Sequence, residues 1–306
     1  MRSSFPFSVV ICVPTLNAGK GWSKWLDSIR PLLSNVDLLV IDSSSSDATA
    51  SEARAIGADV RVIKREDFDH GATRNRALHW IDHDIVVFMT QDALIESAES
   101  ITHLVEAFED PDIGAAYGRQ LPHDNATTLA RHARLFNYPS SSYVVGVEDI
   151  PLRGIKTAFL SNSFAAYRRD ALVAAGGFPH HTILGEDMVA GARLLKRDWK
   201  IAYQAHACVY HSHNYTPWQE FKRYFDIGVL HHREHWLLAW LGRAEGEGAR
   251  FVRSEIDYVW RHAPWQLPNA CIRTVLKYAG YSAGRLEAHL PMHLKRRCSM
   301  HYRYWT

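Results

Sequence analysis

The chain has 306 residues, 47% of them hydrophobic, and a formal net charge of +2. This length and apolar content suffice for one large domain or two small ones with a buried core. The nearly balanced charge gives no indication of nucleic-acid binding. The four cysteines form no CxxC pair, which favours a reducing compartment over a disulfide scaffold or a structural zinc site.

The sequence gives no pattern of a membrane-inserted segment. Met1 is followed by a few polar residues and then by Val9-Val10-Ile11, without the basic and long apolar regions of a signal peptide. No apolar stretch approaches the roughly 20 residues that a spanning helix needs. We therefore expect a cytoplasmic protein, for which contact with a membrane surface stays open.

The first third of the chain alternates between strand and helix patterns. Short β-branched apolar runs predict strands, and apolar residues at helical spacing predict helices. Strands separated by helices of about ten residues indicate βαβ units and a mainly parallel sheet, so the expected fold class is α/β with Rossmann-like topology. The expected strands are 7–13, 37–41, 60–63 and 85–89, and the expected helices are 22–33, 48–56 and 73–81.

The pattern changes after this third. It weakens between 111 and 150, where the Pro/Ser-rich stretch 138–143 suggests a loop over a site. A mixed pattern returns from 157 to about 210, with a helix at 169–175 that Gly176-Gly177 should end. From Pro217 onward the chain is mainly helical and aromatic.

Two acids follow expected strands. Asp42 ends the second strand, and Thr90-Gln91-Asp92 follows the fourth. Ligands of open α/β sheets bind outside the carboxyl ends of the strands. Asp92 is therefore placed to hold a divalent metal on a phosphate, and Asp42 to contact a ribose or a base. Asp47, five residues after Asp42, is better explained as a helix cap.

The stretch Phe68-Asp69-His70-Gly71-Ala72-Thr73-Arg74-Asn75 opens the third helix. Gly71 allows a close backbone approach or a sharp turn. Arg74 in the first turn would suit a phosphate or a base edge, and a surface arginine in a structural turn is the alternative. The loop Pro14–Gly19 has neither GxGxxG nor a Walker A pattern, which argues against a dinucleotide or P-loop site.

Two further clusters carry chemistry in the second half. Glu186 and Asp187 begin a helix. One interpretation is that both acids only complement the helix dipole, and the other is that one of them faces a cleft as a base. His211 and His213 end an apolar run and share one face of an extended segment. They are candidate metal ligands or phosphate donors, although a structural histidine is the commoner case.

The order of these motifs resembles that of the family 2 inverting glycosyltransferases with a GT-A fold, and most closely their bacterial rhamnosyltransferase branch. The resemblance covers about residues 5–215. It is carried by Val13-Pro14-Thr15-Leu16-Asn17, Ile41-Asp42-Ser43-Ser44-Ser45-Ser46-Asp47, Phe68–Asn75, Thr90-Gln91-Asp92-Ala93 and Gly185-Glu186-Asp187-Met188.

The resemblance implies a role for each matching residue. Asp187 would be the general base with Glu186 beside it, and Asp92 and His211 would hold a divalent metal, Mg²⁺ or Mn²⁺. Thr90 stands where the family has the first acid of its Asp-x-Asp motif, which is a departure. Nucleoside, diphosphate and other substrate contacts would come from Pro14, Thr15, Asn17, Asp42, Arg74 and Gln91.

The resemblance also implies a function. The protein would transfer L-rhamnose from dTDP-L-rhamnose to a glycan or polyprenyl-diphosphate-linked acceptor in O-antigen biosynthesis, at the cytoplasmic face of the inner membrane. The alternatives are a family 2 transferase that uses another nucleotide sugar, such as a UDP-hexose, and a non-catalytic nucleotide-sugar-binding protein of the same fold. Residues 1–215 would form the GT-A catalytic domain, with 1–115 as its nucleotide-sugar half and 116–215 as its acceptor half.

The remaining region, 216–306, would be a helical extension rich in aromatic and basic residues. Segments 218–241 and 294–306 both interleave Trp, Tyr or Phe with Lys and Arg. This composition suits an anionic membrane interface. Ordinary helix packing is favoured for the first segment, and membrane contact for the second.

Overall fold

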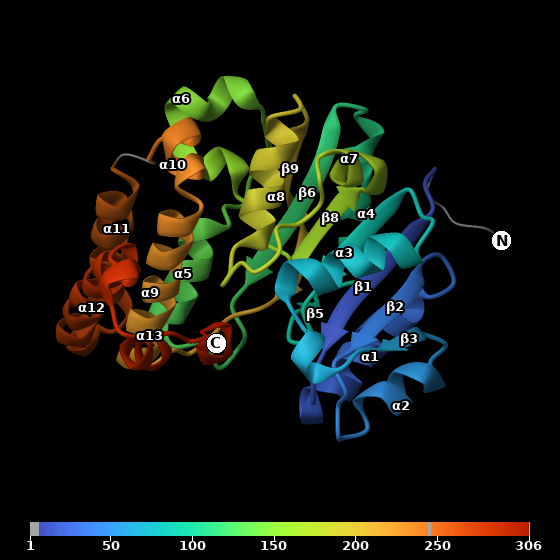
Figure 1. Ribbon diagram of the computed structural model, residues 1–306, viewed down its shortest axis with the longest axis horizontal. Helices are drawn as coiled ribbons and strands as arrows, with labels where there is room; N and C mark the ends of the chain where they lie inside the picture. The colour runs from blue at the N-terminus through green and yellow to red at the C-terminus, as the bar shows by residue number, and fades with distance from the viewer. Residues whose placement is uncertain (1–5, 244–245, 306) are drawn as a thin grey trace.

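The computed structural model describes residues 6–243 and 246–305, and within them nine strands form one sheet (Figure 1). The strand order is β3-β2-β1-β4-β8-β6-β9-β5, and β7 pairs with β9. The strands are β1 (Val9–Thr15), β2 (Asp37–Asp42), β3 (Asp59–Val62), β4 (Ile85–Met89), β5 (Leu94–Ile95), β6 (Ile113–Leu121), β7 (Tyr143–Val145), β8 (Phe164–Arg168) and β9 (Lys200–Tyr210).

Most strands of this sheet run in one direction. β1 is parallel to β2 and β4, β2 is parallel to β3, and β6 is parallel to β9. β8 lies antiparallel between β4 and β6, so β6 and β9 run the same way as β1 to β4. The carboxyl ends of these six strands therefore meet at one edge, together with the amino end of β8.

Helices cover both faces of the sheet. The helices before the C-terminal part are α1 (Trp22–Ile29), α2 (Thr49–Ala55), α3 (His70–Trp80), α4 (Glu99–Val105), α5 (Thr128–Asn137), α6 (Ile150–Arg153), α7 (Arg169–Ala174) and α8 (Glu186–Leu195), of which α6 lies away from the sheet beside α10 (Figure 1). Successive residues of β1 point to opposite faces. Val10 and Cys12 join one apolar core with residues of α3, α7 and α8, whereas Val9 and Ile11 join a second core with α1 and α4. The expected α/β architecture is confirmed.

The predicted elements of the first third are all present, with small differences at their ends. α3 begins at His70, before the expected start, because the carboxylate of Asp69 accepts a hydrogen bond from the Ala72 amide at 2.7 Å. Gly71 allows the close approach expected of it, since a Cβ there would lie 1.8 Å from the Pro179 carbonyl oxygen. The predicted end of α7 is also confirmed, with Gly176 and Gly177 at positive φ.

The C-terminal part is helical, as expected, and forms a layer beside the sheet (Figure 1). Its helices are α9 (Pro217–Arg233), α10 (His235–Leu241), α11 (Glu247–His262), α12 (Leu267–Arg285) and α13 (Met292–Cys298). α9 and α12 pack closely because α12 presents glycines to α9. A Cβ on Gly284 would lie 2.0 Å from the Phe225 carbonyl oxygen, and one on Gly280 would lie 2.3 Å from that of Phe221.

The two segments expected to suit a membrane use much of their aromatic content in packing. Phe225 is fully buried, and Trp305 of the terminal segment is 3% exposed in the same apolar cluster. The Arg233 guanidinium donates a hydrogen bond to the Tyr304 hydroxyl at 2.6 Å. Thr306 lies outside the described residues. None of the described helices is long and apolar enough to cross a membrane.

Candidate active site

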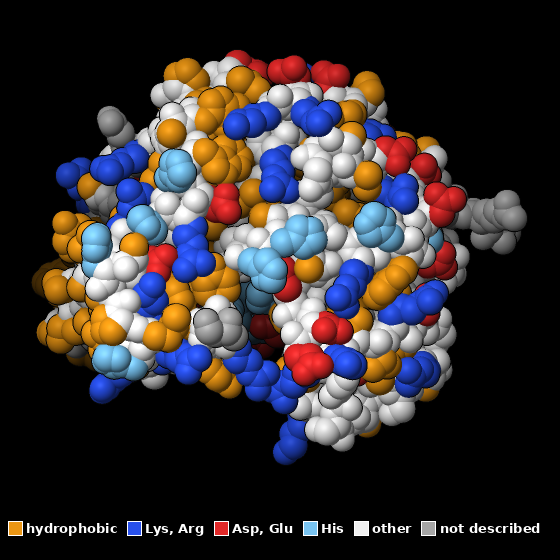
Figure 2. Space-filling view, in the orientation of Figure 1, with side chains coloured by type: hydrophobic (Ala, Val, Ile, Leu, Met, Phe, Trp, Pro, Cys, Tyr) orange, Lys and Arg blue, Asp and Glu red, His pale blue; other side chains and the backbone are white. Residues whose placement is uncertain are grey.

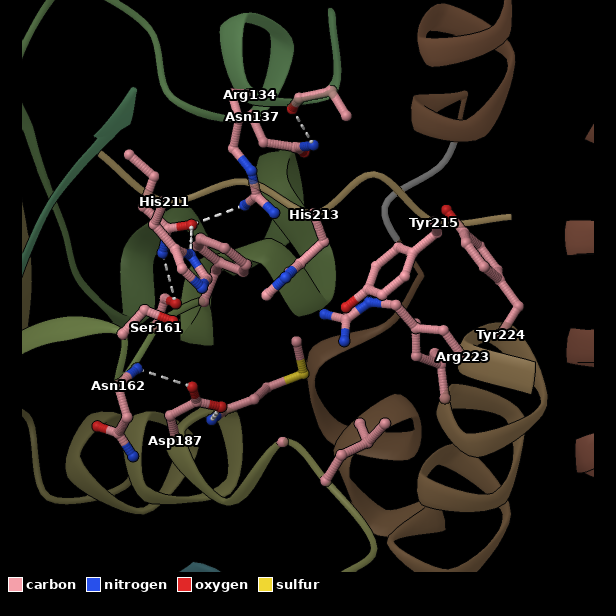
Figure 3. Close-up of a pocket in the computed structure, with 18 of the residues that line it drawn as sticks. Arg134, Asn137, Ser161, Asn162, Asp187, His211, His213, Tyr215, Arg223 and Tyr224 are labelled. Carbon is pink, nitrogen blue, oxygen red and sulfur yellow. Dashed lines mark hydrogen bonds between the residues drawn. The ribbon is translucent and has the colours of Figure 1, made fainter. Parts of the chain in front are cut away.

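A cavity of about 570 Å³ lies where the carboxyl edge of the sheet faces the C-terminal helices (Figure 3). Residues that follow β4 and β9 line one side of it, together with the start of α8. Side chains of α5, α9, α11 and α12 line the other side. Six residues singled out from the sequence as candidates share this cavity: Arg74, Asp92, Glu186, Asp187, His211 and His213.

Asp92, His211 and His213 form a cluster that is compact enough to hold one metal ion, with ligand atoms all within 4.8 Å of one another. The Asp92 carboxylate lies 3.5 Å from Nε2 of His211 and 3.9 Å from Nε2 of His213. β5 explains the encounter, because it pairs antiparallel with β9 and sets Leu94 opposite Tyr210. Asp92 just before β5 and His211 just after β9 therefore become neighbours.

The hydrogen bonds around Gln120 determine the tautomer of His211. Arg134 has only donors, so the Gln120 atom that it contacts at 2.6 Å must be the amide oxygen. The same oxygen lies 2.9 Å from Nδ1 of His211, which must therefore carry a proton. A neutral His211 then presents the Nε2 lone pair to Asp92. Two lone-pair donors that face each other in this way are well suited to a cation between them.

The charge states of the cluster also fit a metal. Burial, with the neighbouring His211, lowers the pKa of His213 to about 4, so this imidazole is neutral and free to coordinate at neutral pH. Burial lowers the pKa of His211 as well, although Asp92 opposes the shift. Burial works against ionisation of Asp92, but its contact with the neighbouring His211 outweighs burial and lowers the pKa of Asp92 below the usual value. Two imidazoles with a carboxylate suit Mn²⁺ better than Mg²⁺, which prefers oxygen ligands.

The acidic pair at the start of α8 is divided between two environments. Glu186 is 6% exposed and pairs with Arg74 at 3.0 Å. Burial would raise the pKa of Glu186, but the Arg74 guanidinium outweighs it and the pKa is lowered. Arg74 is itself 3% exposed and also donates to the His70 carbonyl oxygen at 2.9 Å. The structure thus places Arg74 on Glu186, and its expected contact with base or diphosphate stays a prediction.

Asp187 has the properties of a base that works near neutral pH. Its Oδ2 accepts a hydrogen bond from the Asn162 amide at 3.0 Å, and Asn162 Nδ2 donates to Glu186 at 3.1 Å. Burial and the charge of Glu186 raise the pKa of Asp187 to about 7. A general base is most effective when its pKa lies near the working pH.

The residues expected to hold the nucleoside cluster at the ends of β1 and β2, outside the lining of the cavity. The Thr15 hydroxyl donates to Asp42 Oδ1 at 3.1 Å, and the Ser45 amide donates to Asp42 Oδ2 at 2.8 Å. Asn17, at φ 45°, accepts a hydrogen bond from the Ser46 amide at 2.8 Å. These contacts join the two loops into one surface, and nucleoside binding there stays a prediction.

The other two predicted substrate residues take part in the scaffold of the same edge. Pro14 lies in β1 opposite Ile41 of β2. The Gln91 side chain forms two hydrogen bonds with the backbone of Leu16, at 2.9 Å to its amide and 3.3 Å to its carbonyl oxygen. Gln91 therefore connects the end of β4 to the loop after β1, and contact with substrate by either residue stays a prediction.

Several lining residues carried no motif. Arg134 on α5 and Arg223 on α9 extend guanidinium groups toward His211 and His213 from different sides, with Tyr215 and Tyr224 beside Arg223 (Figure 3). Gln120 holds His211, and Asn162 holds Asp187 and Glu186, through the bonds given above. Arg134 and Gln120 lie in the region whose sequence pattern was weak, so neither gave an indication of its role. Arg223 belongs to an aromatic and basic segment, which only composition had marked.

Comparison with known proteins agrees with this architecture. Residues 10–174 match the family model described as "Glycosyl transferase family 2". The O-antigen chain rhamnosyltransferase WbaN of Salmonella anatum is 46% identical over 302 residues, which cover 98% of this chain and 96% of that protein. The O-antigen chain rhamnosyltransferase RfbN of Salmonella typhimurium is 46% identical over 303 residues, covering 97% and 96%.

Solved structures show the same fold at low sequence identity. The mannosyltransferase PcManGT from Pyrobaculum calidifontis, solved with GDP-Man and Mn²⁺, has a TM-score of 0.58 at 20% identity and covers 99% of this chain and 84% of its own. TarS 1-349 of S. aureus, solved with UDP-GlcNAc, has a TM-score of 0.52 at 16% identity, with coverage of 92% and 91%. The GT-A fold expected from the motifs is confirmed, and the chain belongs to glycosyl transferase family 2.

Proposed function

We propose that this protein is an inverting rhamnosyltransferase of O-antigen biosynthesis, which moves L-rhamnose from dTDP-L-rhamnose to a lipid-linked glycan. The observation that carries the proposal is that Asp187 lines the same cavity as the cluster of Asp92, His211 and His213. Two relatives named as O-antigen chain rhamnosyltransferases, each 46% identical over almost the whole chain, support the choice of sugar and pathway.

Asp187 is the proposed general base. Inversion requires one base that takes the proton of the acceptor hydroxyl as its oxygen attacks the anomeric carbon. Asn162 holds the Asp187 carboxylate through its backbone amide, and Glu186 is held away by Arg74. Glu186 therefore acts on Asp187 through charge: it keeps the pKa of Asp187 high enough for the carboxylate to accept a proton near neutral pH.

The proposed metal ligands are Asp92, His211 and His213. A bound divalent cation would offset the negative charge that develops on the nucleoside diphosphate as it leaves. Arg134 and Arg223 line the same cavity, and their guanidinium groups suit the diphosphate oxygens. Mn²⁺ is the favoured ion because of the two imidazoles, and the mannosyltransferase of the same fold was solved with Mn²⁺.

A donor panel tests the proposal directly. Purified protein with Mn²⁺ is given dTDP-L-rhamnose, UDP-hexoses or GDP-mannose, and binding is followed by the shift in melting temperature. We expect the largest shift with dTDP-L-rhamnose. A larger shift with a UDP-hexose would favour the alternative donor, and binding without any turnover in the presence of a glycan acceptor would favour a non-catalytic nucleotide-sugar-binding protein.

A further inference from the structure

The outer face of α12 carries no charged residue. Its exposed positions are Pro268, Cys271, Ile272, Val275, Tyr278 and Ala279. Ile272, Val275 and Tyr278 follow one another at helical spacing and are 56%, 66% and 75% exposed. A helix on the surface of a water-soluble domain normally turns its polar residues outward. The outward face of α12 has the opposite character.

The charges of α12 point inward instead. Arg273 and Lys277 have side chains that are only 13% and 14% exposed. Arg273 pairs with Glu220 of α9 at 3.1 Å, and Lys277 pairs with Glu255 of α11 at 3.3 Å. All four side chains line the cavity. α12 therefore has a polar side toward the cavity and an apolar side toward the surroundings.

The apolar surface continues onto α11 and the turn between the two helices. Ile256, Trp260 and Trp265 are 42%, 66% and 75% exposed. Figure 2 shows hydrophobic side chains gathered along the left edge of the molecule, over α11 and α12. We call the six residues Ile256, Trp260, Trp265, Ile272, Val275 and Tyr278 the α11–α12 face.

The charges around this face suit an anionic surface. Between residues 256 and 279 the one exposed acid is Asp257, which pairs with Arg261 at 2.9 Å. Arg253 is also exposed on α11, with no acidic partner in the described part of the chain. Tryptophan and tyrosine are the residues enriched where lipid headgroups meet acyl chains, and adjacent cations are attracted by anionic lipids.

We propose that the α11–α12 face lies on a bilayer surface that contains anionic lipid, with its apolar side chains among the headgroups. The proposal deepens the proposed function, since a lipid-linked acceptor is met at a bilayer. α11 and α12 also line the cavity on their inner side, so contact of their outer side with lipid brings the cavity close to the membrane. In this mode of binding the protein lies on the membrane surface, and no segment of the α11–α12 face spans the bilayer.

Vesicle flotation with the full chain tests the proposal. We expect the wild type to float with vesicles of phosphatidylethanolamine and phosphatidylglycerol, and to float far less with phosphatidylcholine alone. The triple variant Trp265→Ser, Val275→Ser, Tyr278→Ser should lose at least about tenfold in vesicle affinity, because binding scales with the apolar area inserted. The single variant Trp265→Ser serves if the triple variant does not fold.

Two exposed apolar residues elsewhere give matched controls. Trp80→Ser at the end of α3 and Leu152→Ser on α6 remove side chains that are 39% and 86% exposed, and neither should change flotation. A wild type that stays unbound, or a triple variant that floats as well as the wild type, would overturn the proposal. So would a change from dimer to monomer in the triple variant without vesicles, since the face would then join two copies of the chain.

A second measurement separates this proposal from the proposed function. Rhamnose transfer to a water-soluble glycan acceptor needs no membrane, so the triple variant should keep wild-type turnover there. Transfer without vesicle binding would reject the membrane face and leave the enzyme activity standing. Vesicle binding without any transfer from dTDP-L-rhamnose would reject the proposed enzyme activity and leave the membrane face standing.

Discussion

The sheet and the C-terminal helical layer distribute polarity in opposite ways. In the sheet, apolar strands fill two cores, and the polar side chains that line the cavity lie at the carboxyl edge. In α12, the ion pairs of Arg273 and Lys277 lie inside, and Ile272, Val275 and Tyr278 lie outside. The sheet therefore follows the rule for a domain surrounded by water, whereas α12 has the arrangement expected of a helix with water-filled space behind it and lipid in front.

The sheet and the helical layer contribute to the site in different ways. The sheet positions the side chains of the site, because Asp92 and His211 lie beside the paired strands β5 and β9, and the Asn162 amide just before β8 donates to Asp187 at 3.0 Å. The helical layer closes the cavity and supplies Arg223 and Lys277 from α9 and α12. Changes in the sheet should therefore act mainly on catalysis and metal binding, and changes in the layer mainly on stability and location.

The largest effect should come from the proposed base. Asp187→Asn keeps the shape of the side chain but cannot take a proton, so rhamnose transfer should fall by about 10²- to 10⁴-fold. Transfer rates with saturating donor measure the effect. Asp170→Asn, an exposed acid at the start of α7 that lines no part of the cavity, is the control and should leave the rate unchanged. Full transfer activity in Asp187→Asn would show that Asp187 is not the general base.

The buried ion pairs of the helical layer give the next effect. Glu255→Ala leaves Lys277 without its nearer acidic partner, so the free energy of unfolding should fall by about 3 kcal/mol. Asp257→Ala on the same helix removes an exposed pair with Arg261 and should cost less than about 1 kcal/mol. Urea unfolding of both variants measures the difference, and equal losses would contradict the distinction between the inner and outer sides of the layer.

Gln120 should tune metal affinity without touching the metal. Gln120→Leu removes the acceptor that holds the Nδ1 proton of His211, so Mn²⁺ affinity should fall by about 10- to 100-fold. Calorimetric titration of the nucleotide-free protein with Mn²⁺ checks this. Gln120→Glu retains an acceptor for both His211 and Arg134 and should restore the affinity. If the leucine variant binds Mn²⁺ as tightly as the wild type, the tautomer argument fails.

The dependence on pH should be the mildest effect. A base acts as its carboxylate, and the pKa of Asp187 is raised to about 7 by burial and by Glu186. The rate should therefore increase with pH, by about tenfold between pH 6 and pH 8 if this carboxyl alone titrates. The residual rate of Asp187→Asn should lack this rise. A wild-type rate that declines over the same interval would assign the limiting group elsewhere.

The sequence predicted the parts of the site that depend on strand ends. Asp42 ends β2, Asp92 and His211 follow β4 and β9, and parallel strands bring these ends to one edge. The pairing of Asp92 with His211 depends on β5, a strand of two residues that is too short to leave a periodic pattern. Gln120 and Arg134 lie in β6 and α5, where the pattern was too weak to predict an element.

The sequence predicted that the C-terminal region is helical, but it did not predict which side chains of these helices face the surface. Composition indicated aromatic and basic helices after Pro217, and the structure contains them. Which aromatic side chains reach the surface depends on tertiary packing, which local sequence does not encode. Trp305 is buried against Phe225, although its segment had the more suggestive composition, whereas Trp265 and Tyr278 are each 75% exposed.

The glycines of α12 determine how closely α12 packs on α9, and therefore where one wall of the cavity lies. Gly280 and Gly284 bring α12 against the backbone of α9 at Phe221 and Phe225, and α9 carries Arg223 to the cavity wall. A single methyl group at residue 284 would push the two helices apart and shift that wall. The width of the cavity is thus set by two glycines that do not line it, and a change of cavity size should begin at the contact between α9 and α12.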